Sequence, residues 1–180
     1  PVPTYSIPTP FSKHPFEFII GFRNTFYLIF FAYFLTIMAV TAANFNLGIF
    51  ALLLILLLCM SFYAEPEDMY FVWVFSQTST KFLLIKILTA LAFSTLLCLP
   101  VSISLMVFYP ENMIAVAGFQ IIGSLYLIAM ILSKYAAFPE KINLPQILLI
   151  ALSVSFPPLL IGIIPYFYSK SITRLNEILK

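Results

Sequence analysis

Long apolar runs alternate with short polar breaks along most of this 180-residue chain. Four runs cover residues 24–45, 47–64, 82–108 and 113–133, and a fifth, residues 144–168, contains the pair Pro157-Pro158. About 20 residues in α-helical conformation cross the hydrocarbon core of a bilayer, and each run is close to or above that length. The pattern therefore predicts an all-α fold, a polytopic transmembrane helical bundle with five membrane segments.

The longest polar break follows the second run and reads EPEDMYFVWVFSQTSTK from Glu65. A residue that precedes proline avoids helical conformation, whereas proline is favoured at the first position of a helix, here Pro66. Glu67 and Asp68 would then lie in the first turn, where the helix dipole favours negative charge. Tyr and Trp follow, and such residues gather at membrane–water boundaries. We expect a surface helix over residues 66–80, between spans two and three.

The ends of the chain differ in composition from its middle. The first ten residues contain four prolines, which is typical of an extended linker, and we expect a fragment of a longer protein. Residues 1–23 are predicted to be this Pro-rich linker and an interfacial helix that leads into the first span. Residues 24–168 would form the transmembrane domain, and residues 169–180 a basic tail.

The amino-acid composition is typical of a protein embedded in a lipid bilayer. Hydrophobic residues make up 62% of the sequence and charged residues 9%, against about 25% charged residues in an ordinary soluble domain. The formal net charge of +2, without a basic stripe, excludes nucleic acid as an expected partner. Cys59 and Cys98 lie inside apolar runs without further ligands nearby, so neither a metal nor another cofactor is expected.

The basic residues predict an orientation. With the N-terminus in the cytoplasm, six of them fall on the cytoplasmic side, and the two external turns, residues 44–46 and 109–112, carry none. These six are Lys13, Arg23, Lys81, Lys86, Lys134 and Lys141. Positive charge is enriched in cytoplasmic loops of membrane proteins, so this orientation is preferred. Lys81 and Lys86 are expected to reach back to the lipid headgroups.

The fifth segment leaves two alternatives open. If residues 144–168 form one kinked spanning helix, Lys170, Arg174 and Lys180 lie outside. If the chain turns back at Pro157-Pro158, the tail stays inside, and each arm of about 12 residues is too short to span. Such a re-entrant segment is tolerated only when it packs within protein.

Motifs of known chemistry are absent from the sequence. It contains no nucleotide-binding GxxxxGK[ST] or GxGxxG, no HExxH and no GxSxG. None of the runs carries Asp, Glu, Arg or His at its centre, where an ion-coupled carrier needs a titrating or ligating group. The chain is therefore not expected to be an enzyme, and any transport would draw its energy from a partner.

The order of elements resembles that of the membrane subunits, or permeases, of type-2 ATP-binding-cassette exporters. A span, a tight turn, a second span, acidic residues, an amphipathic helix, Ser79-Thr80-Lys81 and a long third span follow one another within residues 16–180. In that family, the intracellular helix after span two docks on the ATP-binding subunit. The resemblance implies that the partner-coupling residues are Glu65, Glu67, Asp68, Ser79 and Lys81. The family usually has six spans, which implies a fragment or one half.

The leading hypothesis is a permease subunit of an ATP-driven transporter, an exporter, in the bacterial inner (plasma) membrane. It implies a separate cytoplasmic ATP-binding subunit that hydrolyses ATP, a second permease half as a partner, and an unidentified cargo. The alternative is a non-catalytic membrane scaffold or assembly protein. An enzyme that acts on lipids would need an acid/base or nucleophile pair, which the sequence does not show.

Overall fold

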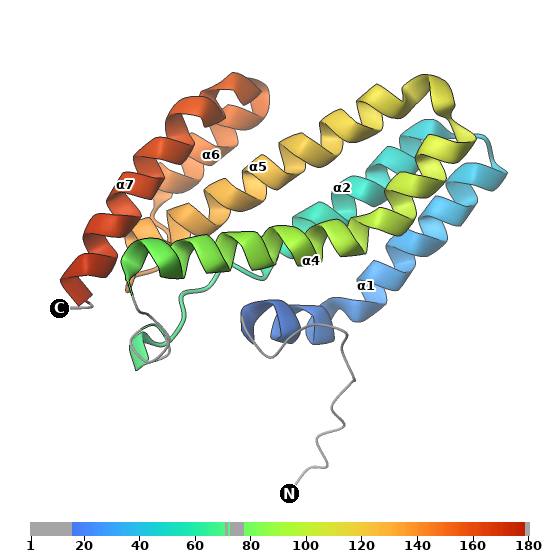
Figure 1. Cartoon of the computed structure of the whole chain (residues 1–180). Coiled ribbons are helices and arrows are strands. Elements are labelled where there is room, and N and C mark those ends of the chain that lie inside the picture. The colour runs from blue at the N-terminus through green and yellow to red at the C-terminus, as the bar shows by residue number, and fades with distance from the viewer. Residues whose placement is uncertain (1–15, 71, 73–77, 179–180) are drawn as a thin grey trace, which may run out of the picture.

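The computed structural model describes residues 16–70, 72 and 78–178 (Figure 1). Within these residues the chain is all-helical, as the sequence predicts. Helix α1 covers Phe16–Thr41, α2 Phe45–Ser61, α4 Ser79–Phe108, α5 Met113–Ala137, α6 Leu144–Ser155 and α7 Leu160–Ile178. Two short 3₁₀ helices, η1 at Pro110–Asn112 and η2 at Pro157–Leu159, precede α5 and α7.

Three of the described helices are long and apolar enough to cross a membrane. They cover Glu17–Thr41, Ser79–Phe108 and Pro110–Ala137, which places this helical bundle among membrane proteins. Helices α2 and α6 are also apolar but have only 17 and 12 residues. The expected count of five spans is thus not reproduced by helix length.

Local side-chain caps explain several helix starts. The side chain of Asn44 accepts a hydrogen bond from the amide of Leu47, and Thr78 accepts one from Lys81, so α2 and α4 each begin one residue later. Asn143 and Gln146 form a reciprocal capping box at the start of α6. These caps satisfy amides that a helix N-terminus leaves without partners.

Helix α2 lies at the centre of the bundle and packs against α1, α4 and α5. Its buried side chains include Leu52, Ile55 and Leu56. Glycines allow the close approach. A Cβ atom at Gly48 would lie 2.3 Å from Leu105 of α4, and one at Gly123 of α5 would lie 2.4 Å from Leu56. A Cβ atom at Gly118 would meet open space, so this glycine is not needed for close helix packing.

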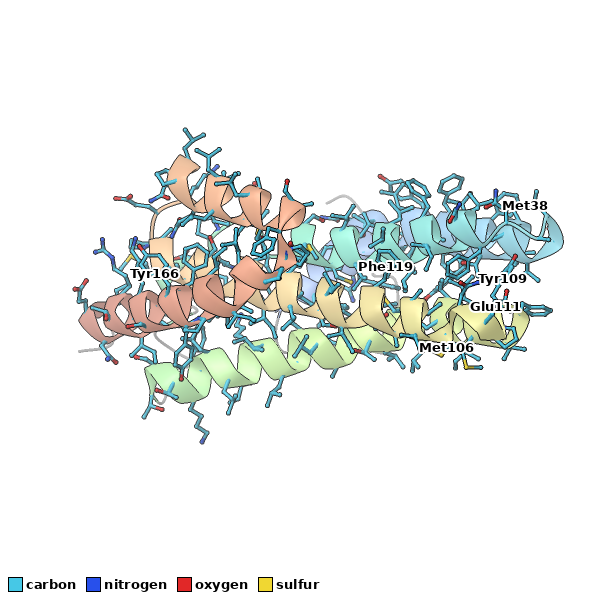
Figure 2. All side chains as sticks on the ribbon, turned by 90° about the horizontal axis from the view of Figure 1, so that it is seen from above. Met38, Met106, Tyr109, Glu111, Phe119 and Tyr166 are labelled. Carbon is cyan, nitrogen blue, oxygen red and sulfur yellow. The ribbon has the colours of Figure 1, made fainter. Side chains whose placement is uncertain are left out.

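The two tight turns meet at one end of the bundle, which we call the turn end. The Tyr109 hydroxyl donates a hydrogen bond to the Ala39 carbonyl over 2.8 Å, and the Tyr109 ring lies 5.5 Å from that of Phe45. Figure 2 shows Tyr109, Glu111 and Met38 together at this end. The opposite end carries the described residues between α2 and α4, which are 62–70, 72 and 78; we call them the connector and this end the connector end.

The chain turns back after α6, which favours the second of the two alternatives for residues 144–168. Helices α6 and α7 form an antiparallel hairpin beside α5, with η2 at its tip (Figure 1). The Ser171 hydroxyl donates to the Leu132 carbonyl over 2.7 Å, and the Ser79 hydroxyl donates to the Asn176 side chain over 2.5 Å. The last turns of α7 therefore lie at the connector end, and residues 169–178 of the expected basic tail are part of this helix.

Candidate functional site

Four charged side chains from separate parts of the chain meet inside the connector end. We call Glu17, Glu67, Lys86 and Lys134 the ionic cluster. Lys86 Nζ lies 2.5 Å from Glu17 Oε2 and 2.6 Å from Glu67 Oε1. Lys134 Nζ lies 2.7 Å from Glu17 Oε1 and 3.3 Å from Glu67 Oε1. Each lysine therefore bridges both carboxylates.

Secondary structure explains how these residues converge. Glu17 lies in the first turn of α1, Lys134 in the last turn of α5, and Lys86 near the start of α4, whereas Glu67 belongs to the connector. Antiparallel packing brings these helix ends to the same level. Glu17 near a helix N-terminus and Lys134 near a C-terminus also interact favourably with the helix dipoles.

The cluster is buried and its charges balance. The side chains are 10% exposed at Glu17 and Lys86, 12% at Glu67 and only 1% at Lys134. Two carboxylates face two ammonium groups, so no net charge is left in a region of low dielectric constant. A buried charge is tolerated when it is paired and hydrogen-bonded. Removal of any one member would leave an excess charge.

Aromatic side chains surround the cluster. The Tyr135 hydroxyl donates a hydrogen bond to Glu67 Oε1, and the Tyr135 ring packs 5.3 Å from Phe82. Lys134 Nζ lies 5.4 Å from the centre of the Tyr135 ring and 5.9 Å from that of Tyr63, at distances where cation–π attraction acts. The buried Tyr63 hydroxyl has no hydrogen-bond partner among the described residues, and burial raises its pKa.

The protonation of Glu67 is set by competing effects. Burial acts to raise the pKa of this carboxyl group, but the charges of Lys86 and Lys134 and the hydrogen bond that Lys86 donates outweigh burial. The pKa of Glu67 falls from its ordinary 4.5 to about 2. Glu67 is therefore a carboxylate at neutral pH, which keeps the connector attached to both lysines.

This shift predicts a loss of stability in acid. A carboxyl group whose folded-state pKa is lowered stabilises the protein above its unfolded pKa, and loses that contribution as the pH falls from 4.5 towards 2. The shift corresponds to about 3 kcal/mol. We expect the melting temperature of the detergent-solubilised protein to fall over this pH range. The matched Glu67→Gln variant, which lacks the titrating group, should melt lower at pH 7 and change less on acidification; parallel pH profiles would contradict this role of Glu67.

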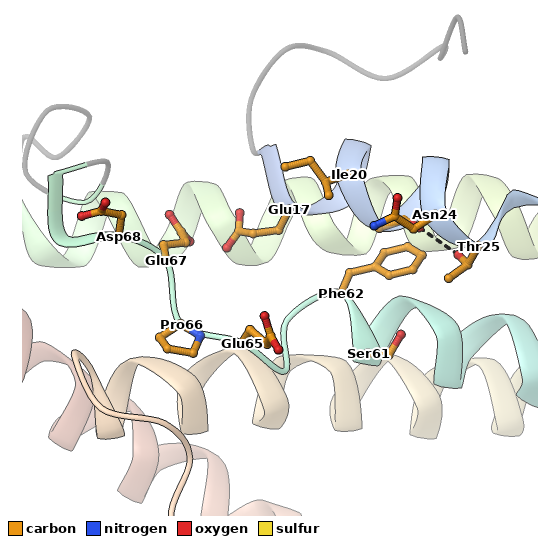
Figure 3. Close-up of a pocket in the computed structure, with 11 residues that line it drawn as sticks. Glu17, Ile20, Asn24, Thr25, Ser61, Phe62, Glu65, Pro66, Glu67 and Asp68 are labelled. Carbon is orange, nitrogen blue, oxygen red and sulfur yellow. Dashed lines mark hydrogen bonds between the residues drawn. The ribbon is translucent and has the colours of Figure 1, made fainter. Parts of the chain in front are cut away.

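A cavity of about 520 Å³ borders the cluster on one side, between α1, the end of α2 and the connector. Glu17 and Glu67 lie along it, together with Glu65 and Asp68 from the connector (Figure 3). Phe62 closes another part of its wall and packs against Gly21, where a Cβ atom would lie 2.3 Å from the Phe62 ring. The carboxylates of the cluster thus border a cavity, while lysines from α4 and α5 hold them.

The structure separates the partner-coupling residues expected from the sequence. Glu65, Asp68 and Lys81 are exposed, and Asp68 Oδ1 accepts a hydrogen bond from the amide of Tyr70. Ser79 is buried and bonded to α7, while Glu67 belongs to the ionic cluster. These five residues therefore do not form one surface, although all lie at the connector end.

Much of the expected surface helix over residues 66–80 lies outside the described residues, which omit 71 and 73–77. Met69, Tyr70 and Val72 are helical, and Val72 is fully buried against the core. Ser79 and Thr80 already belong to α4.

Sequence reasoning missed most of the cluster. The prediction that Lys86 reaches the lipid headgroups is wrong, because its side chain is buried and paired with two carboxylates. Lys134, which the sequence predicts only to be one of the cytoplasmic basic residues, is buried in the last turn of α5. One signal was available in the sequence: antiparallel spans would place Glu17, Glu67, Lys86 and Lys134 at the same end, in matching numbers of acids and bases.

No protein-family model, curated protein or solved structure matches the chain. The interpretation of the site therefore depends on its own geometry and chemistry.

Proposed function

We propose that this chain is a membrane permease subunit of an ATP-driven transporter, an exporter whose ATP is hydrolysed by a separate cytoplasmic subunit. The observation that supports this function is the attachment of the connector to the bundle. Glu67 of the connector is held by Lys86 of α4 and Lys134 of α5, and both lysines also hold Glu17 of α1. A force on the connector would reach three helices through one cluster.

The ion pairs resist separation of the connector from the helical bundle. Separating Glu67 from both lysines would leave two buried ammonium groups to share Glu17, and such an excess buried charge costs about 3–5 kcal/mol in comparable sites. The buried side chains of Tyr63 and Val72 add apolar contacts on either side of Glu67. The connector is therefore expected to move together with the ends of α1, α4 and α5.

The same end offers an acidic surface for a partner. Glu65 and Asp68 are exposed beside the buried Glu67, so one short segment both faces outward and holds the bundle. Arg23, Lys81, Lys141, Lys170 and Arg174 belong to this end as well, and neither turn at the opposite end carries a basic residue. This distribution supports a cytoplasmic location of the connector end, where an ATP-binding subunit would reach it.

A purification experiment tests the proposal. The tagged full chain is purified from native membranes, and bound ATP-binding subunits are detected by photolabelling with an azido-ATP. We expect the wild type to retain such a subunit, and Glu65→Lys combined with Asp68→Lys to reduce its amount at least tenfold. Both side chains are exposed, so the double variant should still fold. Glu67 is left unchanged because its replacement would disturb the buried cluster.

The control places the same kind of change at the turn end. Glu111→Lys reverses an exposed charge there and should leave the amount of ATP-binding subunit unchanged. If the wild type retains no ATP-binding subunit, the transporter proposal is wrong. Stable association with other membrane proteins alone would then favour the non-catalytic scaffold or assembly protein.

A further inference from the structure

Helix α4 has a break in its hydrogen-bond ladder at Pro100. Proline has no N–H group, so the carbonyl of Leu96 lacks its usual helical donor, and sharp kinks in helices occur at such positions. The Ser104 hydroxyl donates to the Pro100 carbonyl over 2.7 Å, and this kind of bond also bends helices. Figure 1 shows that α4 bends before its last turns. The break divides α4 into a connector-side part, residues 79–96, and a turn-side part, residues 97–108.

The connector-side part of α4 is held in place at several points. Lys86 belongs to the ionic cluster and contacts both of its carboxylates. The Phe82 ring lies 5.3 Å from that of Tyr135 in α5, and the Ser79 hydroxyl donates to the Asn176 side chain of α7 over 2.5 Å. These contacts fix the connector-side part to α1, α5 and α7.

Two tyrosine hydroxyl groups bind the turn-side part of α4 to α1. Tyr33 of α1 donates to the Leu97 carbonyl over 2.9 Å, directly beside the break. Tyr109, the residue that follows α4, donates to the Ala39 carbonyl over 2.8 Å at the turn end. The two hydrogen bonds therefore lie at opposite ends of the turn-side part, one close to Pro100 and the other at its far end.

A cavity of about 330 Å³ separates α1 from the turn-side part of α4. Thr36 of α1 and Ser104 of α4 line it, but each of these hydroxyl groups donates to a carbonyl of its own helix. Between the bonds of Tyr33 and Tyr109, the described residues therefore form no further hydrogen bond across the cavity. Close-packed side chains resist displacement, whereas a cavity leaves room for one helix to move against the other.

The two tyrosine bonds differ in their access to water. Tyr109 lies two residues before the exposed Glu111 of the turn, so water can replace the carbonyl as its partner, and such an exchange costs little. Tyr33 lies inside the Glu17–Thr41 span, about 12 Å from Thr41 along the helix axis, where hydrocarbon supplies no substitute partner. The Tyr109 bond should therefore break more readily than the Tyr33 bond.

We propose that α4 contains a hinge at Pro100, and that the bond from Tyr109 to Ala39 is the latch that keeps the turn-side part against α1. When the latch opens, the turn-side part moves away from α1 about Pro100, the Tyr33 bond beside the hinge is kept, and the cavity opens towards the turn end. The arm from Pro100 to Phe108 is about 12 Å long, so a change of about 20° in the kink moves its end by about 4 Å. The hinge does not depend on the proposed ATPase partner, because the movement occurs within the chain itself.

Distances between pairs of spin labels test the latch on the full chain in lipid nanodiscs, without an ATP-binding subunit. Met38→Cys combined with Val107→Cys places labels at exposed positions near the turn end of α1 and α4. The native cysteines are fully buried and should not take up the label. We expect Tyr109→Phe, which removes only the hydroxyl group, to raise at least threefold the population of distances that exceed the main one by about 4 Å or more. Tyr27→Phe, a matched control at an exposed tyrosine of α1, should leave the distribution unchanged.

Two further measurements test the position of the hinge. Pro100→Ala restores the amide that α4 lacks, and when it is added to Tyr109→Phe it should lower the population of longer distances at least threefold. A second label pair, Ile20→Cys with Leu84→Cys, joins exposed positions of α1 and the connector-side part of α4. This pair should keep the same distance in every variant.

Three results would overturn the proposal. Equal distributions for the wild type and Tyr109→Phe would show that this hydroxyl group is not a latch. An unchanged population of longer distances after Pro100→Ala would show that the movement does not occur at this proline. Equal changes in the second label pair would indicate that the whole bundle loosens. If Pro100→Ala does not fold, as judged by size-exclusion chromatography, the comparison of Tyr109→Phe with Tyr27→Phe still decides. Retention of an ATP-binding subunit, measured separately, tests only the proposed function.

Discussion

Replacement of Lys134 by methionine is expected to lower the free energy of unfolding by about 3–5 kcal/mol. The Lys134 side chain is only 1% exposed and contacts both carboxylates of the ionic cluster. Its loss leaves Glu17 and Glu67 to share Lys86, with one excess negative charge in a buried site. Methionine has a similar length and an apolar stem, so the change reports mainly on the charge. The measurement is equilibrium unfolding of the purified protein in a mild detergent.

The control for this variant is Lys141→Met, which removes a lysine from the exposed loop that follows α5. It should change the stability by less than about 0.5 kcal/mol, as surface substitutions usually do. A second substitution provides a sharper test. Glu67→Gln added to Lys134→Met restores one carboxylate against one ammonium group, and should regain part of the lost stability. Equal stability of Lys134→Met and Lys141→Met would show that the cluster contributes nothing.

Local sequence signals predict much of the helical architecture. Asn44 and Asn143 cap the helices that follow them, and Pro110 opens the short helix before α5, so these boundaries depend on neighbouring residues alone. The apolar runs are long enough to indicate helices in a membrane without knowledge of their partners. The all-α bundle follows from such features, because each of them acts over a few residues.

The ionic cluster depends on tertiary contacts that the sequence does not display. Glu17 and Lys134 are separated by 117 positions, and each alone resembles a residue at a membrane boundary, where a charge can face water. Lys86 likewise resembles a lysine that reaches lipid headgroups. Only the packing of α1, α4 and α5 shows that the same end of the bundle encloses these side chains.

The direction that the chain takes after Pro157-Pro158 also depends on tertiary contacts. Prolines in a membrane helix are compatible with a kink or with the end of the helix. The sequence near them therefore does not distinguish one kinked span from a chain that turns back. Contacts between residues far apart in the sequence select the turn over the kink. Ser171 bonds to Leu132, and Ser79 to Asn176, only when α7 returns to the connector end.

Replacement of the whole cluster by apolar side chains is expected to preserve stability and to abolish coupling. The variant combines Glu17→Met, Glu67→Met, Lys86→Met, Lys134→Met and Tyr135→Phe; the last change removes a hydroxyl group whose acceptor is lost. Buried ion clusters that are exchanged as a unit for apolar side chains of similar size often match or exceed the original stability, by about 1–4 kcal/mol. The melting temperature should therefore equal or exceed that of the wild type.

The expected loss concerns function, and it depends on the proposed ATP-driven transport. Ion pairs fix the position of Glu67 relative to three helices. Apolar contacts between methionines are not directional, so the side chains can move past one another. A force on the connector would then no longer move the helix ends together. In proteoliposomes that contain the purified complex, the effect of cargo on ATP hydrolysis should fall at least tenfold while the ATP-binding subunit stays bound through Glu65 and Asp68. The Tyr135→Phe variant keeps all four ion pairs and should retain most of the coupling. A stable apolar variant with normal coupling would show that the charges do not transmit the motion, and a strongly destabilised one would show that they serve the fold.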